Sequence, residues 1–529
     1  MIPRIQPPWL RSIARQVLLA VLVALPGVLV TTAQAALVIS PTGPTTNVTC
    51  LHHVCTATAS SAVLNRKTLQ NQLAVANVKV VSGSLANDIV VSATVTWVSS
   101  HTLTLDSYHS IAIGKPVSVS VAGSGGLTLT TNDGGTGGQL SFVATTSNIT
   151  FWSLASGLTI NGHPYTLVND IATLASDIAA TPGGYYALAK SYDATPDGTY
   201  AASPIPTTYV GAFEGLGNTI SHLTINSTDL DLGLFKKLGA GGTLRDIGVP
   251  EASVTNVPRL YSFIAYVGTL VGFSDGTIFG AFGSGTVTTG KDPWAGGLVG
   301  AINSGSISNS FAATNVSIGI SVEAITAAGG LVGVNSGVIN NCRANGNVVG
   351  GSGTMLGGLV GENLAGIVSA SYARGSVASL PHGQREGEGG LVGVNNNGAT
   401  IINSYATGAV QSIRKSGSST GGLVGFTNGV VENSYSIGAV EPGGTYVGGS
   451  IGDDESASGS VVDSYWDTST SGITNLSRGA GNVSNDPGIT GLTTAQLQSA
   501  LPTGFDPSIW GESTTVNGGL PYLLAMPLP

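Results

Sequence analysis

The sequence Gly-Gly-Leu-Val-Gly occurs five times in one part of the chain, at 296–300, 329–333, 357–361, 389–393 and 421–425. Degenerate copies stand on either side, as Gly-Thr-Leu-Val-Gly at 268–272 and Gly-Gly-Ser-Ile-Gly at 448–452. When Leu298 and its equivalents are aligned, the seven copies follow one another at spacings of 27 to 33 residues. Repetition at this period is typical of stacked structural units, each too small to bury its own apolar side.

Two further elements recur after these copies. The first reads Asn-Ser-Phe-Ala from Asn309 and returns, with variation, from positions 341, 370, 403, 433 and 463. The second is a valine, at Val316, Val348, Val377, Val410 and Val440. The apolar runs are three to five residues long, rich in Val, Ile and aromatic residues, and separated by Gly, Asn and Ser, so they predict strands. We therefore expect an all-β fold in which each repeat forms one coil of three short strands in a β-solenoid.

The repeat also predicts which side chains face the core. We expect Leu298 and its equivalents to stack into an apolar ladder, beside a second ladder of Ile307, Ile339, Ile367 and Ile401. Each such side chain removed from water contributes ~1.5–3 kcal/mol. The flanking glycines are expected at sharp turns that need positive φ, and the asparagines at turns in the left-handed region. Repeat length varies mainly between the valine and the next Gly-Gly-Leu-Val-Gly, which predicts loops on one side.

Gly-Gly-Leu-Val-Gly followed by Asn-Ser-Tyr-Ala resembles the GLUG repeat of large bacterial surface proteins of the filamentous-haemagglutinin type and of some bacterial immunoglobulin-A peptidases. The resemblance extends to residues 211–225 and 233–235, and downstream to 465–468 and 518–523. It implies an extracytoplasmic, right-handed parallel β-helix. The peptidases need a zinc-binding His-Glu-x-x-His helix, and none of the seven histidines here is followed by Glu, which argues against protease activity.

The first 35 residues predict a cleaved signal peptide. Three arginines precede an apolar run at 17–30 that is too short to span a bilayer, and Ala33-Gln-Ala35 is typical of a cleavage site. We expect a secreted or cell-surface protein with no transmembrane segment in the mature chain. Cleavage takes the net charge from −9 to −12, and so acidic a chain is not expected to bind nucleic acid.

Two of the three cysteines, Cys50 and Cys55, lie close enough in sequence to close a small disulfide loop in an oxidising compartment. A metal site with His52 and His53 is the alternative, but no second ligand pair lies nearby, and we expect no metal and no cofactor. Cys342 occupies the Ser position of its repeat and is expected to fill space there rather than to act as a nucleophile.

The rest of the chain divides into four further regions. Residues 36–165 contain ten short alternating segments between 78 and 160, after one helix near 67–75, and predict an N-terminal β-helix region continuous with the repeats. Residues 166–205 predict a protruding insertion with a helix capped at Asn169 or Asp170, and Asp193 and Asp197 in a turn or a calcium site. The repeats occupy 206–470. Residues 471–529 predict a C-terminal cap, with a capping box at 493–496.

Candidate site residues are few. Asp453, Asp454 and Glu455 form the best acidic cluster, either as a solvated loop or as the acids of a carbohydrate-active lyase or hydrolase. The tyrosines at 372, 405, 435 and 465 predict a buried stack, with an exposed ladder for glycans as the alternative. Stacking would also bring inter-repeat loops into one charged edge, whose weak binding candidates are His382, Arg385, Glu386, Glu388, Arg414 and Lys415.

The sequence thus favours a non-catalytic adhesin or surface scaffold of filamentous-haemagglutinin type. Its expected partner is a glycan or surface protein of a host or neighbouring cell, and the sequence sets no oligomeric state. The alternative is a carbohydrate-active β-helix enzyme, a polysaccharide lyase or hydrolase, that uses Asp453, Asp454 and Glu455.

Overall fold

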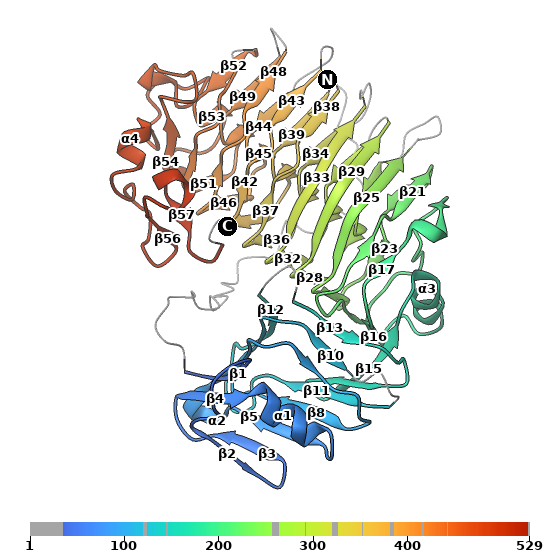
Figure 1. Ribbon diagram of the computed structural model, residues 1–529. Coiled ribbons are helices and arrows are strands. Elements are labelled where there is room, and N and C mark those ends of the chain that lie inside the picture. The colour runs from blue at the N-terminus through green and yellow to red at the C-terminus, as the bar shows by residue number, and fades with distance from the viewer. Residues whose placement is uncertain are drawn as a thin grey trace.

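The computed structural model describes residues 35–119, 124–143, 147–256, 264–290, 293–319, 326–351, 353–380, 386–413, 417–441 and 443–526. Across these residues the chain forms a parallel β-solenoid of about 15 turns with few helices (Figure 1). The predicted solenoid class is therefore confirmed, and its right-handed winding stays a prediction. Apart from Ala35, the predicted signal peptide lies outside the described residues.

The ten alternating segments of the N-terminal region all form strands. They stack in three parallel walls, and their alternate residues, such as Leu103 and Leu105, point into one core. The first wall contains β5 (Val78–Val81), β8 (Thr102–Asp106), β11 (Gly126–Thr130) and β14 (Gly157–Ile160). The second contains β6 (Asp88–Val91), β9 (Ile111–Ile113) and β12 (Leu140–Phe142), and the third β7 (Val95–Thr96), β10 (Val117–Val119) and β13 (Ile149–Phe151).

A helix completes the first coils. β1 (Ala36–Ser40) lies between β6 and β4 (Ser61–Asn65), and α1 (Arg66–Leu73) follows β4 directly. The side chain of Asn65 caps α1 by accepting a hydrogen bond from the backbone N–H of Lys67, 2.8 Å away. Leu69 and Leu73, one turn apart, are fully buried in the core, which accounts for the helical spacing in the sequence.

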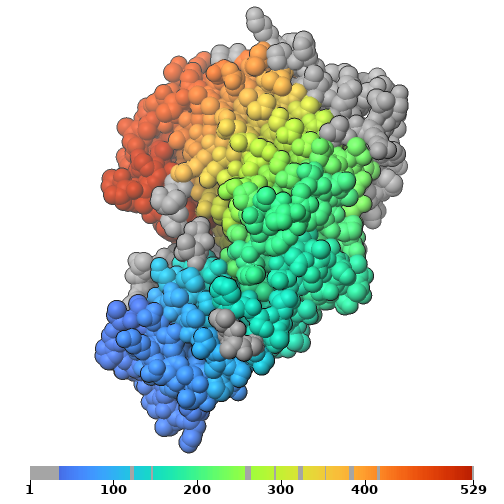
Figure 2. Space-filling view, turned by 45° about the vertical axis from the view of Figure 1, so that its right-hand side comes forward, coloured from blue at the N-terminus to red at the C-terminus, as the bar shows by residue number. Residues whose placement is uncertain are grey.

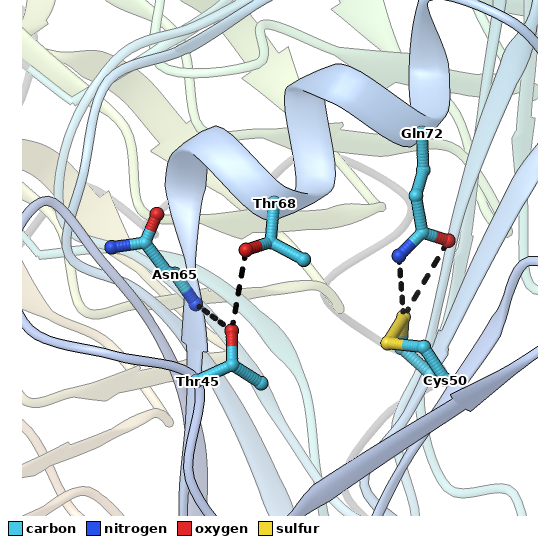
Figure 3. Close-up of a disulfide and its surroundings, with 6 residues drawn as sticks. Thr45, Cys50, Asn65, Thr68 and Gln72 are labelled. Atoms are coloured by element: carbon cyan, nitrogen blue, oxygen red, sulfur yellow. Dashed lines mark hydrogen bonds between the residues drawn. A yellow bond between two sulfur atoms is a disulfide. The ribbon is translucent and has the colours of Figure 1, made fainter.

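The predicted disulfide joins the two strands of a hairpin, β2 (Val48–Leu51) and β3 (Val54–Ala57). Cys50 and Cys55 face each other across the strands, with Cα atoms 4.0 Å apart. His52 and His53 form the two-residue turn, both with positive φ, as a type I′ hairpin requires. Figure 3 shows Gln72 of α1 extending to this disulfide, so the hairpin is tied to the helix that completes the first coils.

The segment predicted as a protruding insertion is instead part of the solenoid. β15 (His163–Val168) pairs antiparallel with β14 and parallel with β16 (Tyr185–Leu188), which pairs with β19 (Ala212–Glu214). Between them runs α3 (Ile171–Ala180), capped by Asp170, whose carboxylate accepts the N–H of Thr173 at 2.7 Å. Strand pairing is thus continuous through the junction, but the reversal at β15 separates two apolar cores. The N-terminal coils accordingly form a blue lobe at one end of the repeat region in Figure 2.

In the repeat region the solenoid has four walls, numbered here separately from those of the N-terminal coils. Each repeat adds a strand to each wall, so there is one wall more than the sequence predicted. The first wall contains β19, β24 (Thr243–Arg245), β28 (Thr277–Phe279), β32 (Ser306–Ser308), β36 (Val338–Asn340), β41 (Ile367–Ser369), β46 (Thr400–Ile402), β51 (Val430–Ser436) and β54 (Val461–Asp467). The second contains β21 (Thr224–Ser227), β25 (Gly248–Asn256), β29 (Phe282–Thr289) and β33 (Phe311–Ile318). It continues in shorter pieces, β37 (Arg343–Ala344), β42 (Tyr372–Ala373) and β47 (Tyr405–Ala406), and β38 (Val348–Gly350), β43 (Val377–Ser379) and β48 (Val410–Ser412).

The third and fourth walls meet at the Gly-Leu pair of each repeat. The third wall contains β22 (Asp231–Leu232), β26 (Ala265–Val267), β30 (Pro293–Gly296), β34 (Thr326–Gly329), β39 (Thr354–Gly357), β44 (Glu386–Gly389), β49 (Ser418–Gly421) and β52 (Tyr446–Gly448). The fourth contains β23 (Phe235–Leu238), β27 (Val271–Ser274), β31 (Val299–Ile302), β35 (Val332–Asn335), β40 (Val360–Asn363), β45 (Val392–Asn395), β50 (Val424–Thr427) and β53 (Ile451–Asp454). The strands of the third wall differ in sequence from repeat to repeat, so periodicity did not reveal them.

The leucine ladder is confirmed, and the isoleucine ladder needs one correction. Leu298 and its equivalents are fully buried, and the N–H of each leucine donates to the carbonyl of the equivalent residue one repeat later, as from Leu298 to Leu331 at 3.0 Å. In the second ladder Val368, not Ile367, pairs with Ile339 and is buried, whereas Ile367 is 43% exposed. The alternation in β41 is therefore displaced by one residue from the predicted position.

The repeat glycines serve a different purpose from the one predicted. None of the glycines in the five Gly-Gly-Leu-Val-Gly copies lies in the left-handed region. A Cβ on Gly296 would instead meet the carbonyl oxygen of Val299, and one on Gly361 would lie 2.6 Å from the backbone nitrogen of Ala328. Glycine is required because the third and fourth walls approach backbone to backbone. The predicted left-handed turns are formed by the asparagines, such as Asn309 and Asn403, both with a φ of 50°.

Polar side chains also stack from repeat to repeat inside the solenoid. The amide of Asn335 donates to Asn363 at 2.9 Å, and that of Asn363 to Asn395 at 3.0 Å, all three fully buried. Another ladder fills the turn after the first wall, where the hydroxyl of Ser371 accepts the N–H of Cys342 at 3.0 Å. Buried polar groups are thereby satisfied within the ladders, and Cys342 fills a serine position as expected.

The C-terminal segment folds back along the side of the solenoid. β55 (Ile489–Leu492) pairs with β54 and extends the last coil, and α4 (Thr494–Leu497) follows it. The strands β56 (Trp510–Gly511) and β57 (Tyr522–Leu523) then cover the outer side of the second wall. There Tyr372, Tyr405 and Tyr435 stack with ring centroids 4.8 and 5.0 Å apart. The predicted tyrosine stack is thus buried, under Phe505, Trp510, Leu523 and Met526. The predicted capping box of α4 is present.

Candidate functional site

Only two of the six residues predicted at the charged edge, Glu386 and Glu388, belong to the described residues. His382, Arg385, Arg414 and Lys415 lie outside the described residues, and Glu386 begins β44. Glu388 was predicted in an exposed loop, and this is wrong, because it lies in β44 and is fully buried. Leu356, the strand partner of Glu388, also faces the core. The carboxylate of Glu388 accepts a hydrogen bond from the hydroxyl of Thr420 at 3.3 Å. The alternation of the unpredicted third wall turns this side chain inward.

The acidic cluster does not form one site either. Asp453 lies in β53, almost completely buried and 3.5 Å from the hydroxyl of Ser419, whereas Glu455 is exposed. Asp453 and Asp454 are successive residues of β53 and point to opposite sides of the strand, so their two carboxylates do not converge as catalytic acids must. Asp454 instead lies beside Asp486 at a pocket of about 240 Å³. Burial, opposed by the N–H of Gly488, raises the pKa of Asp486, and its hydrogen bond with Asp454 raises it further.

Asp193 and Asp197 are occupied by their own loop. The carboxylate of Asp193 accepts both the N–H and the hydroxyl of Thr195, which lowers its pKa. Asp197 accepts the hydroxyls of Tyr192 and Tyr200 at 2.5 and 2.6 Å. These hydrogen bonds correspond to the turn interpretation rather than to a calcium site.

A pocket of about 390 Å³ lies on the N-terminal coils, away from every predicted site residue. Three successive coils contribute to it at the same corner, with Asn87 and Asp88 after α2 (Gly83–Ala86), Tyr108 and His109 between β8 and β9, and 134–136 between β11 and β12. Strand stacking therefore brings together turns that are more than 20 residues apart in sequence. A concave surface on which a few polar side chains converge is a candidate for a binding site.

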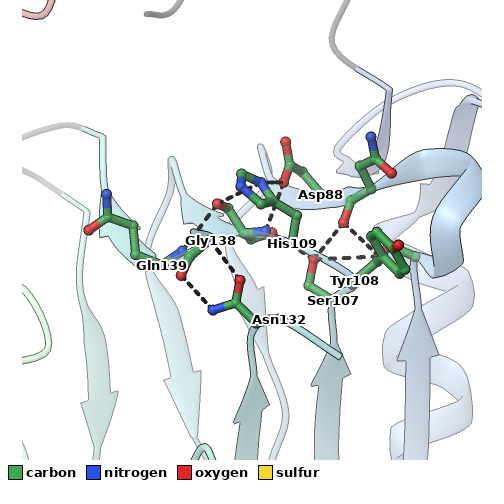
Figure 4. A network of polar contacts seen from close by, with 10 residues as sticks. Asp88, Ser107, Tyr108, His109, Asn132, Gly138 and Gln139 are labelled. Carbon is green, nitrogen blue, oxygen red and sulfur yellow. Dashed lines mark hydrogen bonds and ion pairs between the residues drawn. The ribbon is translucent and has the colours of Figure 1, made fainter. Parts of the chain in front are cut away.

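The pocket contains a histidine–aspartate pair. The Nδ1 atom of His109 lies 2.8 Å from Oδ1 of Asp88, and Figure 4 shows the imidazole turned toward that carboxylate. Oδ1 of Asp88 also accepts the N–H of Ser110 at 2.8 Å, and the Asp88 side chain is only 8% exposed. A carboxylate at Nδ1 orients the ring and leaves Nε2 for a ligand. Among the described residues no hydrogen-bond partner occupies that nitrogen, and the ring is 37% exposed.

Asn87 is held in a strained backbone conformation beside this pair. Its φ of 48° and ψ of −61° lie outside the left-handed helical region and close to those of the rare γ-turn. Its carbonyl accepts three hydrogen bonds, from the hydroxyls of Ser82 and Ser107, both at 3.0 Å, and from the N–H of His109 at 2.9 Å. Strain of this kind persists where the surroundings enforce it, and it gathers at functional sites.

The turn that contains Gly135 and Gly138 lies against the backbone of Tyr108 and His109. A Cβ on Gly135 would meet the carbonyl oxygen of Tyr108, and one on Gly138 that of His109. The side chain of Asn132 fixes this turn from within, by accepting the N–H of Gly138 at 2.7 Å and donating to its carbonyl at 2.8 Å. The wall of the pocket is therefore rigid, and its polar groups are placed before any ligand arrives.

Asp88 and His109 were not among the site residues predicted from the sequence. Asp88 and His109 each stand in a turn between short strands, 21 residues apart, and no spacing rule connects them. The one available signal is that Ser107-Tyr-His-Ser110 gathers polar and aromatic residues between two strongly apolar strands.

No protein-family model matches the chain. Halomucin from Haloquadratum walsbyi (strain DSM 16790 / HBSQ001) is 38% identical to it over 102 residues, which is 19% of this chain and 1% of halomucin. The similarity is therefore local and covers a very small part of that protein. None of the helices in the described ranges is both long and apolar enough to cross a bilayer.

Proposed function

We propose that the chain is a secreted or cell-surface β-solenoid of GLUG repeats that acts as a non-catalytic adhesin or surface scaffold of the filamentous-haemagglutinin type. The observation that carries this proposal is the uninterrupted stacking of one cross-section through seven repeats, from β26 to β53. Such a stack is an extended, stiff wall, which suits the display of binding surfaces at a distance from a cell.

Three other features support an extracytoplasmic location. The disulfide between Cys50 and Cys55 is expected to form in an oxidising compartment, and the sequence begins with a predicted signal peptide. The local similarity to halomucin is a third supporting feature, restricted to 102 residues.

Cell fractionation tests the proposed extracytoplasmic location, and binding assays test the proposed adhesive role. The chain would be expressed with and without residues 1–35, and the labelled product applied to whole cells, a glycan array and an array of matrix proteins. The same product, unfolded by heat and reduction, is the control. We expect export that depends on residues 1–35, and binding by the folded chain alone. Retention in the cytosol would contradict the location, and absence of binding on all three surfaces would contradict adhesion.

The rival enzyme hypothesis has its own measurement. Turnover of acidic polysaccharides that is abolished by Asp453→Ala would favour it, although the burial of Asp453 in β53 leaves its carboxylate little access to a substrate.

A further inference from the structure

We propose that the pocket around His109 and Asp88 binds one neutral hexopyranose residue of a glycan. This inference rests on the proposed adhesive function and gives it a site and a ligand class. It is built on the pocket described above, whose lining includes Asn87, Asp88, Tyr108, His109 and Thr136.

The charge of the lining selects against anionic ligands. None of the described residues that line the pocket is a lysine or arginine, and Asp88 supplies its one carboxyl group. A phosphate, a sulfate or a uronate would bring a second negative charge to a partly buried carboxylate, which is unfavourable at low effective dielectric. The ligand is therefore neutral.

The polar groups match a polyhydroxylated ring. The lining offers a carboxylate, an imidazole nitrogen, an amide and a hydroxyl, which together donate and accept hydrogen bonds. Neighbouring hydroxyls of a sugar do both, so each can bind to one of these groups. An apolar ligand would desolvate these groups and leave them without hydrogen-bond partners, which is unfavourable.

The aromatic ring of Tyr108 supplies the apolar part of such a site. It lies against Gly134, where a Cβ would approach its Cε2 atom to 2.8 Å, so the ring is held in place by the turn beside it. The C–H face of a pyranose packs well on an aromatic ring, and rigid amphipathic rings lose little entropy on binding.

The size and rigidity of the site agree with one ring. Its volume of about 390 Å³ lies at the lower end of the ~300–1,000 Å³ range of small-molecule sites. Because Asp88, His109 and Asn87 are already held by hydrogen bonds to Ser110, Ser82 and Ser107, binding requires little further ordering.

The test uses the purified full chain and an array of methyl α- and β-hexopyranosides, with methyl glucuronides as charged counterparts, followed by titration of each hit. The variants are His109→Ala and Asp88→Asn. The matched control is His222→Ala. The Nδ1 atom of His222 also lies beside an aspartate carboxylate, 3.0 Å from Asp193, but its Nε2 atom is already paired with Glu251 at 2.8 Å and is not open to a ligand. Circular dichroism and a melting curve verify that each variant is folded.

We expect a neutral hexoside to bind, at least a tenfold loss of affinity in His109→Ala and Asp88→Asn, and no change in His222→Ala. Equal affinity of all variants for the hexoside would show that it binds elsewhere, and would overturn this site without contradicting the proposed adhesive function. Binding to cells or matrix proteins without any neutral hexoside would overturn the ligand class alone. Preferential binding of glucuronides, or release of reducing sugar during the titration, would overturn the proposal of neutral, non-catalytic binding.

Discussion

The indole N–H of Trp510 donates a hydrogen bond to the side-chain oxygen of Asn403, 3.2 Å away, although 107 residues separate the two. Asn403 belongs to the left-handed turn of its repeat, and Trp510 to the segment that returns along the solenoid. Two further bonds join the same surfaces, from the hydroxyl of Tyr435 to the carbonyl of Pro521 at 2.6 Å and from that of Tyr465 to the carbonyl of Thr503 at 2.9 Å. The returning segment is thus fastened across several repeats, rather than to the last coil alone.

Trp510→Ala should detach this segment. The indole is buried and stacks on Phe505 with centroids 4.4 Å apart, so its removal should cost about 3–5 kcal/mol, as for other buried aromatic residues. Limited proteolysis should then cleave after residue 493 while the solenoid resists, and near-UV circular dichroism should lose the tyrosine signal. The matched control is Trp152→Ala, because Trp152 is 59% exposed and should change neither measurement. Equal protease resistance in both variants would contradict the fastening.

Gly361→Ala should destabilise the repeat region although the substitution is small. The new Cβ would lie 2.6 Å from the backbone nitrogen of Ala328, and two hydrogen-bonded walls cannot separate locally to accept it. We expect a loss of about 1–3 kcal/mol in the free energy of unfolding, measured by chemical denaturation. Gly157→Ala is the control, since a Cβ there has no neighbour within 4 Å and needs no positive φ. A stable Gly361→Ala variant would mean that the walls are less closely packed than described.

The Cys342 thiol should be inert in the folded protein. Burial raises its pKa to about 12, so hardly any thiolate exists at pH 8, and no solvent path reaches a fully buried side chain. A thiol reagent should modify it only after unfolding. Cys342→Ser should be folded and within about 1 kcal/mol of the parent, because serine occupies the same position in neighbouring repeats, as at Ser371 and Ser404. Rapid modification of the native protein would contradict the buried ladder.

Stability should fall as the pH rises across the acidic range. Burial raises the pKa of Glu214 from 4.5 to about 7, against the opposing influence of Arg245, and it also raises the pKa of the neighbouring Asp246. The folded state therefore keeps protons that the unfolded state releases above pH 4.5. The stabilisation of the folded state by these two protonated carboxyls is complete below about pH 4.5 and is lost as the pH rises toward 7. The melting temperature should therefore decline between these two pH values.

Glu214→Gln should make this decline shallower, because its side chain does not titrate. Glu251→Gln is the control, since the Glu251 side chain is 70% exposed and no comparable burial affects it. The measurement is the melting temperature at half-unit pH steps between 4 and 8. An unchanged slope in Glu214→Gln would exclude this carboxyl as the source.

The two halves of the molecule differ in what periodicity could predict. In the N-terminal coils, alternation alone placed ten strands, because each segment is half buried and its period of two is a local property. In the repeats, the shared residues predicted the ladder of Leu298, but they could not reveal the third wall, whose strands from β30 to β52 share only a final glycine. The inward orientation of Glu388 follows from that wall and was therefore missed.

By itself the sequence determined the solenoid class, the leucine ladder, the turn asparagines and the disulfide, since each depends on residues close in sequence or on one repeated position. Only the tertiary structure decided why the glycines are needed, where the C-terminal segment packs, and that Asp88 and His109 share a pocket. These depend on the distance between backbones and turns from different coils. The register in which the strands stack sets the distance between backbones and between turns of different coils, and the residues of a single coil do not encode that register.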